Sequence, residues 1–271
     1  MKMIRHKFDF ILIAIIICTV IACVKTSISS SVSQVAAFTV VNVIPNSIPV
    51  ISVIGTSSPM DYFFNAQKIS YGSFYEYAPI GGNDTVLVVQ NNSDTLNTGP
   101  KESGLMYYNI LKLKIGGTYS LFLCGADTTS PDYLLIDDTL PYHNPSDSVM
   151  GIRFVNLSTG SNPISINLEG SPNGSEVSSL PYKGITSFKQ YINNSTIIDY
   201  LFVVRDAATG DSVTQFDFLA NGSSNNGYGL TDPSNNQNNG NLLTFKNITI
   251  AVYGSESNPN APLTTMLVDN Y

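Results

Sequence analysis

The segment FTVVN at Phe38–Asn42 returns later in the chain as IRFVN at Ile152–Asn156. Both are short runs of β-branched and aromatic residues that end on Val-Asn. Each is followed, at the same spacing, by a proline–aliphatic pair, Pro49–Val50 and Pro163–Ile164. Runs of this composition bounded by Asn and Pro are typical of β-strands. A strand that recurs together with its flank indicates a duplicated domain.

The duplication continues along the chain. Further segments recur in the same order: Ile69–Tyr71 with Leu180–Tyr182, Leu87–Val89 with Phe202–Val204, Thr118–Gly125 with Asn247–Gly254, and Leu135–Asp137 with Leu267–Asp269. This order predicts a first domain at 35–138 and a second at 149–271, joined by a proline-containing linker at 139–148. The second copy is longer chiefly because of a polar insert at 221–241.

The rest of each copy consists of further short strands separated by Gly, Asn, Pro or Asp, and no stretch has the sustained periodicity of a capped helix. About seven strands in roughly 100 residues is what an immunoglobulin-like domain requires. We therefore predict an all-β fold of two tandem immunoglobulin-like antiparallel β-sandwich domains. Of the cysteines, only Cys124 lies in these domains, so no internal disulfide can form. Its apolar flank predicts that it ends a buried strand.

The N-terminus has the parts of a secretory signal. A basic start precedes the apolar run Phe10–Ala22, which is shorter than the roughly 20 residues of a membrane helix. The last four residues, Val20–Cys23, resemble the lipobox of bacterial lipoproteins, which implies cleavage before Cys23 and lipid on that cysteine. Residues 1–22 are then a signal peptide and 23–34 a lipidated, Ser-rich tether. An ordinary signal peptide with a chance cysteine is the alternative.

A family resemblance spans nearly all of the mature chain. The segments FTVVNV with IPV, IRFVNLS with NPI, GGTYSLFLCG and LLIDDTLP, behind the lipobox, resemble the bacterial lipoproteins of domain-of-unknown-function family 4397. The resemblance implies a β-sandwich and an envelope location, and it implies no reaction. Because Val24 replaces the Asp that retains some lipoproteins at the inner membrane, the expected location is the outer membrane of a Gram-negative bacterium, on either side of it.

The charge balance limits the classes of partner. The chain has a net charge of −7, and cleavage before Cys23 would remove more basic than acidic residues. An acidic chain without a basic run has no electrostatic footprint for nucleic acid or anionic lipid. The expected partners are the membrane, through lipid on Cys23, and a protein or glycan.

Catalytic chemistry has little support in the sequence. The one histidine of the mature chain, His143, lies in the linker, where we expect it to be solvent-exposed. No nucleophile elbow, phosphate-binding loop or dinucleotide fingerprint occurs. The adjacent Asp137 and Asp138 would point to opposite faces of a strand. They are a poor catalytic pair, and without an Asp-rich loop a weak calcium site. We predict no catalytic, cofactor or metal residues, and we expect Asp137 and Asp138 to form a polar strand end.

Two patterns point to surface chemistry. Tyr71, Tyr75 and Tyr77 form a candidate ligand platform, because aromatic rings stack on sugars. The tripeptide Asp-Ser/Thr-apolar resembles an O-glycosylation acceptor of some Gram-negative envelopes; its candidate residues are Thr85, Thr95, Thr128, Thr139, Ser148 and Ser212. The leading hypothesis is a non-enzymatic cell-envelope lipoprotein that serves as a structural or interaction module. The alternatives are a carbohydrate-binding surface lipoprotein and, from another class, a carboxylate-dependent glycoside hydrolase.

Overall fold

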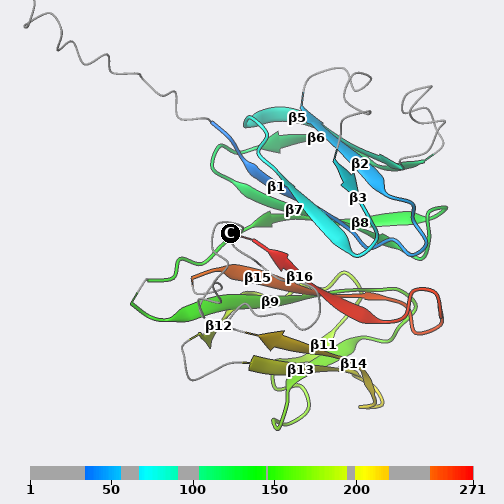
Figure 1. Ribbon diagram of the computed structural model, residues 1–271, viewed down its shortest axis with the longest axis vertical. Helices are drawn as coiled ribbons and strands as arrows, with labels where there is room; N and C mark the ends of the chain where they lie inside the picture. Colours follow the sequence, from blue (N-terminus) through cyan, green and yellow to red (C-terminus); the bar gives the residue numbers. More distant parts are fainter. Residues whose placement is uncertain are drawn as a thin grey trace, which may run out of the picture. The chain divides into compact units, whose positions relative to one another are not determined.

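The computed structural model describes residues 34–55, 67–90, 104–144, 146–193, 199–219 and 245–270. These residues form sixteen β-strands and no helix, which confirms the all-β prediction (Figure 1). The strands make four four-stranded sheets, two for each sandwich. Cys23 and the predicted signal peptide lie outside the described residues.

The first sandwich is built from eight strands. They are β1 (Ala37–Asn42), β2 (Val50–Gly55), β3 (Lys68–Ile69), β4 (Ser73–Tyr77), β5 (Gly82–Gln90), β6 (Leu105–Leu113), β7 (Thr118–Gly125) and β8 (Pro131–Asp138). One sheet has the order β4-β1-β7-β8 and is called the first inner sheet below. The other has the order β3-β2-β5-β6 and is called the first outer sheet.

The second sandwich repeats this arrangement strand for strand. Its strands are β9 (Val149–Ser158), β10 (Ile164–Leu168), β11 (Val177–Leu180), β12 (Lys189–Ile192), β13 (Asp199–Asp206), β14 (Ser212–Leu219), β15 (Asn247–Gly254) and β16 (Thr264–Asp269). The second inner sheet has the order β12-β9-β15-β16 and the second outer sheet the order β11-β10-β13-β14. In both inner sheets the central pair is parallel, β1 with β7 and β9 with β15, while the other pairs are antiparallel.

The Val-Asn motif that marks the repeat anchors the next sheet. At the end of β1, the Asn42 side chain donates to the Ile69 carbonyl at the end of β3, at 3.2 Å. At the end of β9, Asn156 donates in the same way to the Leu180 carbonyl at the end of β11, at 2.9 Å. The side-chain oxygen of each asparagine accepts a hydrogen bond from the backbone amide two residues further along the chain. The asparagine therefore ties the inner sheet of each sandwich to its outer sheet.

One pair of segments in the predicted repeat is aligned wrongly, by one residue. Val50 pairs with Gln90, and its counterpart Ile164 pairs with Asp206, so the register makes Val86 equivalent to Phe202. The sequence comparison matched Leu87 with Phe202 instead. A one-residue slip in a strand moves every side chain to the other face. Val86 and Phe202 both lie in the core of their sandwich, whereas Leu87 does not.

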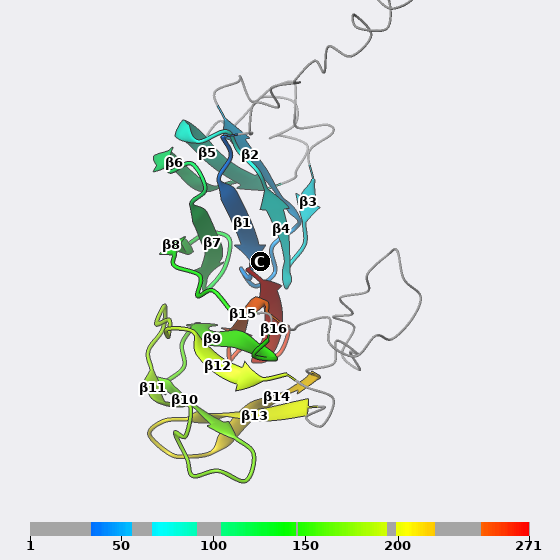
Figure 2. The same ribbon diagram turned by 90° about the vertical axis from the view of Figure 1, so that its left-hand side faces the viewer.

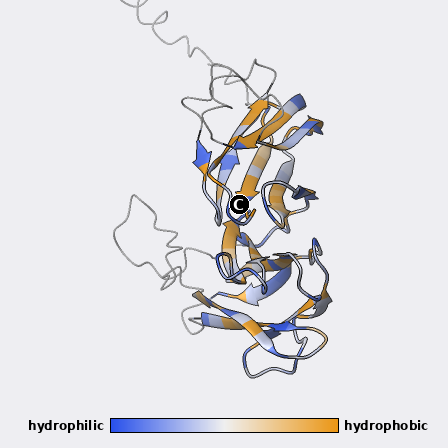
Figure 3. Ribbon diagram, turned by 90° about the vertical axis from the view of Figure 1, so that its right-hand side faces the viewer, coloured by the Kyte–Doolittle hydropathy of each residue, from blue (hydrophilic) through white to orange (hydrophobic). Residues whose placement is uncertain are grey.

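The two inner sheets pack against each other, between the two outer sheets (Figures 1 and 2). Their shared apolar cluster contains Val41 and Phe122 from the first sandwich and Val155 and Val268 from the second. Alternate residues of the same strands, such as Phe38 and Phe154, fill the cores of the individual sandwiches. The central strands β1, β7, β9 and β15 are consequently buried on both faces, and Figure 3 shows hydrophobic colouring on strands of both sandwiches.

The interface is two-fold in character. Tyr71 of the first sandwich packs edge-on against Tyr253 of the second, with ring centroids 5.5 Å apart. Tyr182, the counterpart of Tyr71, donates from its hydroxyl to the sulfur of Cys124, the counterpart of Tyr253, at 3.2 Å. The contact of Tyr71 with Tyr253 is thus repeated by their counterparts Tyr182 and Cys124, as in the isologous interface of a symmetric dimer.

The linker histidine is buried, which makes the expectation of an exposed His143 wrong. Its side chain is 4% exposed, and its Nε2 lies 2.9 Å from Oδ1 of Asn247. Asn247 also donates to the Pro141 carbonyl, at 3.0 Å. A Cβ at Gly151 would overlap the Asn247 side chain, so only glycine admits this contact. These contacts hold the linker against β15. They also give the buried His143 ring a hydrogen-bond partner, as buried polar groups usually have.

Candidate functional site

A buried polar network occupies the centre of the interface between the two inner sheets. Nη1 of Arg153, on β9, lies 2.7 Å from Oδ1 of Asp138 at the end of β8, with side chains 5% and 0% exposed. The Arg153 Nε donates to Thr249 at 2.8 Å, and Ser120 donates to Asp138 at 2.6 Å. Asn270 accepts a hydrogen bond from Thr249 and donates to Ser120. The network joins strands of both sandwiches.

The network is two-fold in the same way as the apolar cluster, with one exception. Asn270 is the counterpart of Asp138 and Thr249 the counterpart of Ser120, as the strand registers show. The counterpart of Arg153 is Thr39, which is buried and whose hydroxyl has no hydrogen-bond partner among the described residues. The exception gives this network one cation, Arg153, and one anion, Asp138, on one side of the two-fold relation only.

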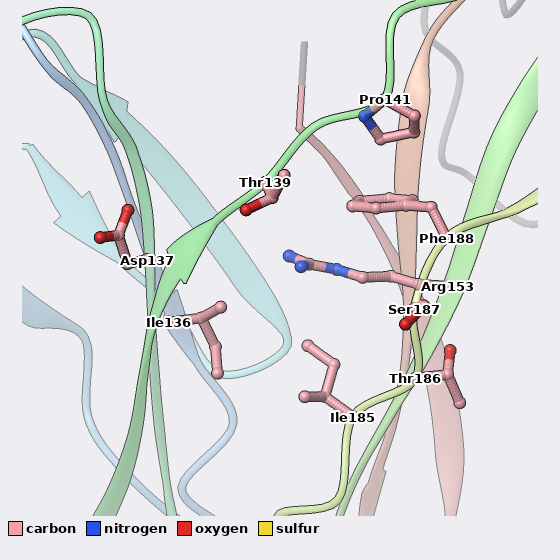
Figure 4. Close-up of a pocket in the computed structure, with 9 residues that line it drawn as sticks. All are labelled: Ile136, Asp137, Thr139, Pro141, Arg153, Ile185, Thr186, Ser187 and Phe188. Atoms are coloured by element: carbon pink, nitrogen blue, oxygen red, sulfur yellow. The ribbon is translucent and has the colours of Figure 1, made fainter.

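A cavity of about 470 Å³ opens beside the arginine, at the junction of the two sandwiches (Figure 4). Its lining residues are Ile136, Asp137, Thr139, Pro141, Arg153, Ile185, Thr186, Ser187 and Phe188. The guanidinium of Arg153 points into the space between β8 and the segment 185–188, and the two isoleucines face each other across it. The Nη2 of Arg153 is buried without a hydrogen-bond partner among the described residues. Arg153 therefore keeps a buried, unpaired N–H donor at the edge of a cavity with apolar walls.

The Arg153 side chain is fixed from two directions. Its Cζ lies 4.5 Å from the centroid of the Phe188 ring, a cation–π contact, and Asp138 neutralises its charge. Since the guanidinium covers one face of Phe188, that face is not free to stack on a sugar. What the cavity offers is a preorganised donor for an oxygen acceptor, the hydroxyls of Thr139 and Ser187, and an apolar surface.

Arg153 was not among the residues singled out from the sequence. The signal was nevertheless there, because IRFVN places a charged residue where its repeat partner FTVVN has Thr39. A charged residue inside an otherwise apolar strand is almost never buried without a partner. Nothing local in the sequence identifies Asp138 as that partner.

Asp137 and Asp138 point to opposite faces of β8, as predicted, but the expectation of a merely polar strand end is wrong for Asp138. Asp137 is exposed and pairs with Lys114 at 2.6 Å, whereas Asp138 lies in the buried network. The two carboxylates do not converge, so they make neither a catalytic pair nor a shared calcium site. Among the described residues, no group of three His, Cys, Asp or Glu side chains could hold a metal ion.

The three tyrosines of the predicted platform do not lie together. Tyr75 and Tyr77 are in contact, with ring centroids 5.0 Å apart, and Tyr75 is 41% exposed. Tyr77 packs against the core of the first sandwich, and burial raises the pKa of its hydroxyl to about 12. Tyr71 belongs to the cluster between the sandwiches. Only the Tyr75 ring is therefore available as a surface for a ligand.

The predicted glycosylation residues differ in accessibility. Thr139 and Ser212 are exposed, whereas Thr85, Thr128 and Ser148 are half-buried. Thr95 and the insert 221–241 lie outside the described residues. Modification of these residues stays a prediction. Cys124 is fully buried at the end of β7, as predicted, and burial raises the pKa of its thiol to about 11, which keeps the sulfur protonated and unreactive at neutral pH.

A second cavity, also of about 470 Å³, lies at one end of the first sandwich, between Ile54, Pro79 and Asp84. Asp84 is only 5% exposed, and one of its carboxylate oxygens has no hydrogen-bond partner among the described residues. Burial raises the pKa of Asp84 above its ordinary value. The charged carboxylate is therefore a cost to folding rather than a gain.

We expect the variant Asp84→Asn to be more stable than the parent at pH 7. A raised pKa in the folded state means that stability is greatest below the ordinary carboxyl pKa and falls as the pH rises through the raised value. Asparagine does not ionise, so the variant avoids this loss of stability. A gain of roughly 1 kcal/mol in the free energy of unfolding should raise its melting temperature by about 2–4 °C for a chain of this size. Thermal melts of both proteins at pH 3 and pH 7 test this. An equal difference at the two pH values would contradict it.

The comparisons with known proteins identify no family. No protein-family model matches the sequence, and no curated protein matches it. Among solved structures, a candidate adhesin from Bacteroides ovatus is 12% identical with a TM-score of 0.25, over 86% of this chain and 92% of that one. A family 26 carbohydrate-binding module from Eubacterium rectale Amy13K, solved with maltoheptaose, is 8% identical with a TM-score of 0.24, over 88% and 97%. A streptococcal virulence factor described as binding alpha-glucan is 9% identical with a TM-score of 0.24, over 87% and 97%.

At these TM-scores the three likenesses carry no argument about what this chain binds. No helix among the described residues is long and apolar enough to cross a membrane.

Proposed function

We propose that the chain is a non-enzymatic binding module of the bacterial cell envelope, held at the outer membrane by lipid on Cys23, and that it takes its partner at the junction cavity. The observation that carries the proposal is that Arg153 lines this cavity while its Nη2 is buried without a hydrogen-bond partner in the described part of the chain. A buried donor left unpaired costs free energy, and a ligand oxygen that accepts from it recovers that cost.

The chemistry of the cavity favours a peptide segment of another envelope protein. A backbone carbonyl can accept from Nη2 of Arg153, while an apolar side chain fits between Ile136 and Ile185. Asp138 already balances the arginine charge, so the site does not require an anionic ligand. Because both sandwiches line the cavity and the network fixes their junction, the site is preorganised, which lowers the entropic cost of binding.

A photoactivatable crosslinking amino acid at the exposed Thr139 tests this proposal in intact cells. We expect a single protein adduct, identified by mass spectrometry as an envelope protein, that decreases at least tenfold when Ser187→Trp blocks the cavity mouth. The matched control carries the crosslinker at Ser212, which is also exposed and lies on β14. The same adduct from Ser212, or an adduct insensitive to Ser187→Trp, would contradict a site at the junction.

The second candidate is a carbohydrate-binding lipoprotein, which the exposed Tyr75 favours over the cavity as its site. The purified protein applied to an oligosaccharide array separates the two candidates. Saturable binding lost in Tyr75→Ala and kept in Ser187→Trp would replace the peptide proposal. We do not propose the carboxylate-dependent hydrolase, because one acidic residue lines each of the two described cavities and that mechanism uses two.

A further inference from the structure

The two outer sheets share a topology but differ in the chemistry of the face turned away from the core. In the first outer sheet, register places Val53, Leu87 and Tyr108 across this face, with Ile51 beside Val89. Their counterparts in the second outer sheet are Asn167, Val203 and Gln215, with Ser165 beside Arg205. Ile51, Leu87 and Val89 are themselves buried, so the exposed apolar side chains of this face include Tyr108 and Ile110 on β6.

The apolar face ends at an edge strand. β6 is the last strand of the first outer sheet and pairs only with β5 among the described residues. On the outer face of β6, Tyr108 is 59% exposed and Ile110 is 61% exposed. The equivalent positions on β14, the edge of the second outer sheet, are Gln215 and Asp217. A charged side chain on an edge strand opposes pairing with another strand, and β6 lacks that charge at this point.

From this contrast we infer that β6 is a dimerisation strand, and that two copies of the chain associate by antiparallel pairing of β6 with β6 about a two-fold axis at Asn109. This dimer is independent of the binding site at the junction cavity. The pairing joins the two first outer sheets edge to edge, and its contact is isologous, because each copy contributes the same strand.

The sequence of β6 is complementary to itself about this axis. With Asn109 opposite Asn109, Tyr108 of each copy lies opposite Ile110 of the other, and both side chains are on the apolar face. Aromatic and β-branched residues facing each other are among the favourable cross-strand pairs. The one charged residue of the strand, Lys112, lies three positions from the axis. The two lysines are then roughly 20 Å apart, at about 3.4 Å per residue, which is beyond the Debye length of about 8 Å at physiological salt.

The test is disulfide trapping in the full-length chain, in the envelope of the cells that make it. At the axis, the two Cα atoms of residue 109 are about 4.5–5.5 Å apart in an antiparallel ladder, a separation that a disulfide spans. Asn109→Cys should give at least tenfold more reducible dimer than the parent on a non-reducing gel. The native Cys124 is buried and does not contribute. The matched control is Gln215→Cys on β14, from which we expect no dimer above the parent.

A second variant shows whether the apolar pair drives the association. In the Asn109→Cys background, Tyr108→Gln and Ile110→Asp place on β6 the residues that the second copy of the domain carries on β14, and the dimer should fall to the level of the parent. Failure of Asn109→Cys to dimerise while its melting temperature stays that of the parent would overturn the inference. So would a crosslinked band whose mass is not that of two copies, or a dimer that survives the double replacement.

Discussion

Replacing Arg153 with methionine lowers the free energy of unfolding by about 3–5 kcal/mol, the range expected when one partner of a buried ion pair is removed. The loss comes less from the vanished attraction than from Asp138, whose carboxylate side chain is 0% exposed and would remain in the interface without its cation. Thr249 would also lose the hydrogen bond from the arginine Nε. Urea denaturation of the full chain measures the effect as a shift of the midpoint at constant slope.

Two double variants separate the ion pair from simple packing. Arg153→Met with Asp138→Leu removes both charges and should recover most of the loss, because a well-packed apolar pair can replace a buried ion pair. Arg153→Thr with Asp138→Asn installs the residues found at the equivalent positions Thr39 and Asn270, which makes the network symmetric. A double variant no more stable than Arg153→Met would show that the carboxylate is not the source of the loss.

The strands and their duplication could be predicted from the sequence because both are local properties. Runs such as Thr118–Gly125 carry β-branched and aromatic residues between turn residues, and their order in the chain repeats. The alignment of β5 with β13 failed by one residue, since the four consecutive aliphatic residues VLVV of β5 give no alternation from which to fix the register.

The packing of the two sandwiches on each other was missed, although a signal for it exists. A strand with one face in water alternates apolar and polar residues, whereas a strand buried on both faces is apolar throughout. The run LFLC within β7 is of the second kind, and its residues divide between the core, with Leu121, and the interface, with Phe122. The pairing of Arg153 with Asp138 in the candidate site could not be predicted from the pattern of residues along a strand. Asp138 and Arg153 belong to different strands of different sandwiches, and only the fold brings them together.

Replacing Asn156 with alanine lowers the free energy of unfolding by about 2–3 kcal/mol. The side chain of Asn156 is fully buried, donates to the Leu180 carbonyl at 2.9 Å and accepts from the Ser158 amide at 3.0 Å. Truncation leaves a buried carbonyl and a buried amide without partners, and each such group costs about 1–3 kcal/mol. Because the first bond ties β9 to β11, protection of β11 from hydrogen exchange should fall more than that of β15.

The first copy of the domain supplies the comparison that makes this prediction sharp. Asn42 makes the equivalent bonds to Ile69 and Ile44, but at 3.2 and 3.3 Å. Bonds of that length lie at or beyond the end of the usual range, so Asn42→Ala should cost less than Asn156→Ala. Asn83→Ala, which removes an exposed asparagine from β5, should change the unfolding midpoint little. If Asn42→Ala and Asn156→Ala both behave like Asn83→Ala, the Val-Asn motif marks the repeat without stabilising it, and the link from inner to outer sheet must reside in the apolar cores alone.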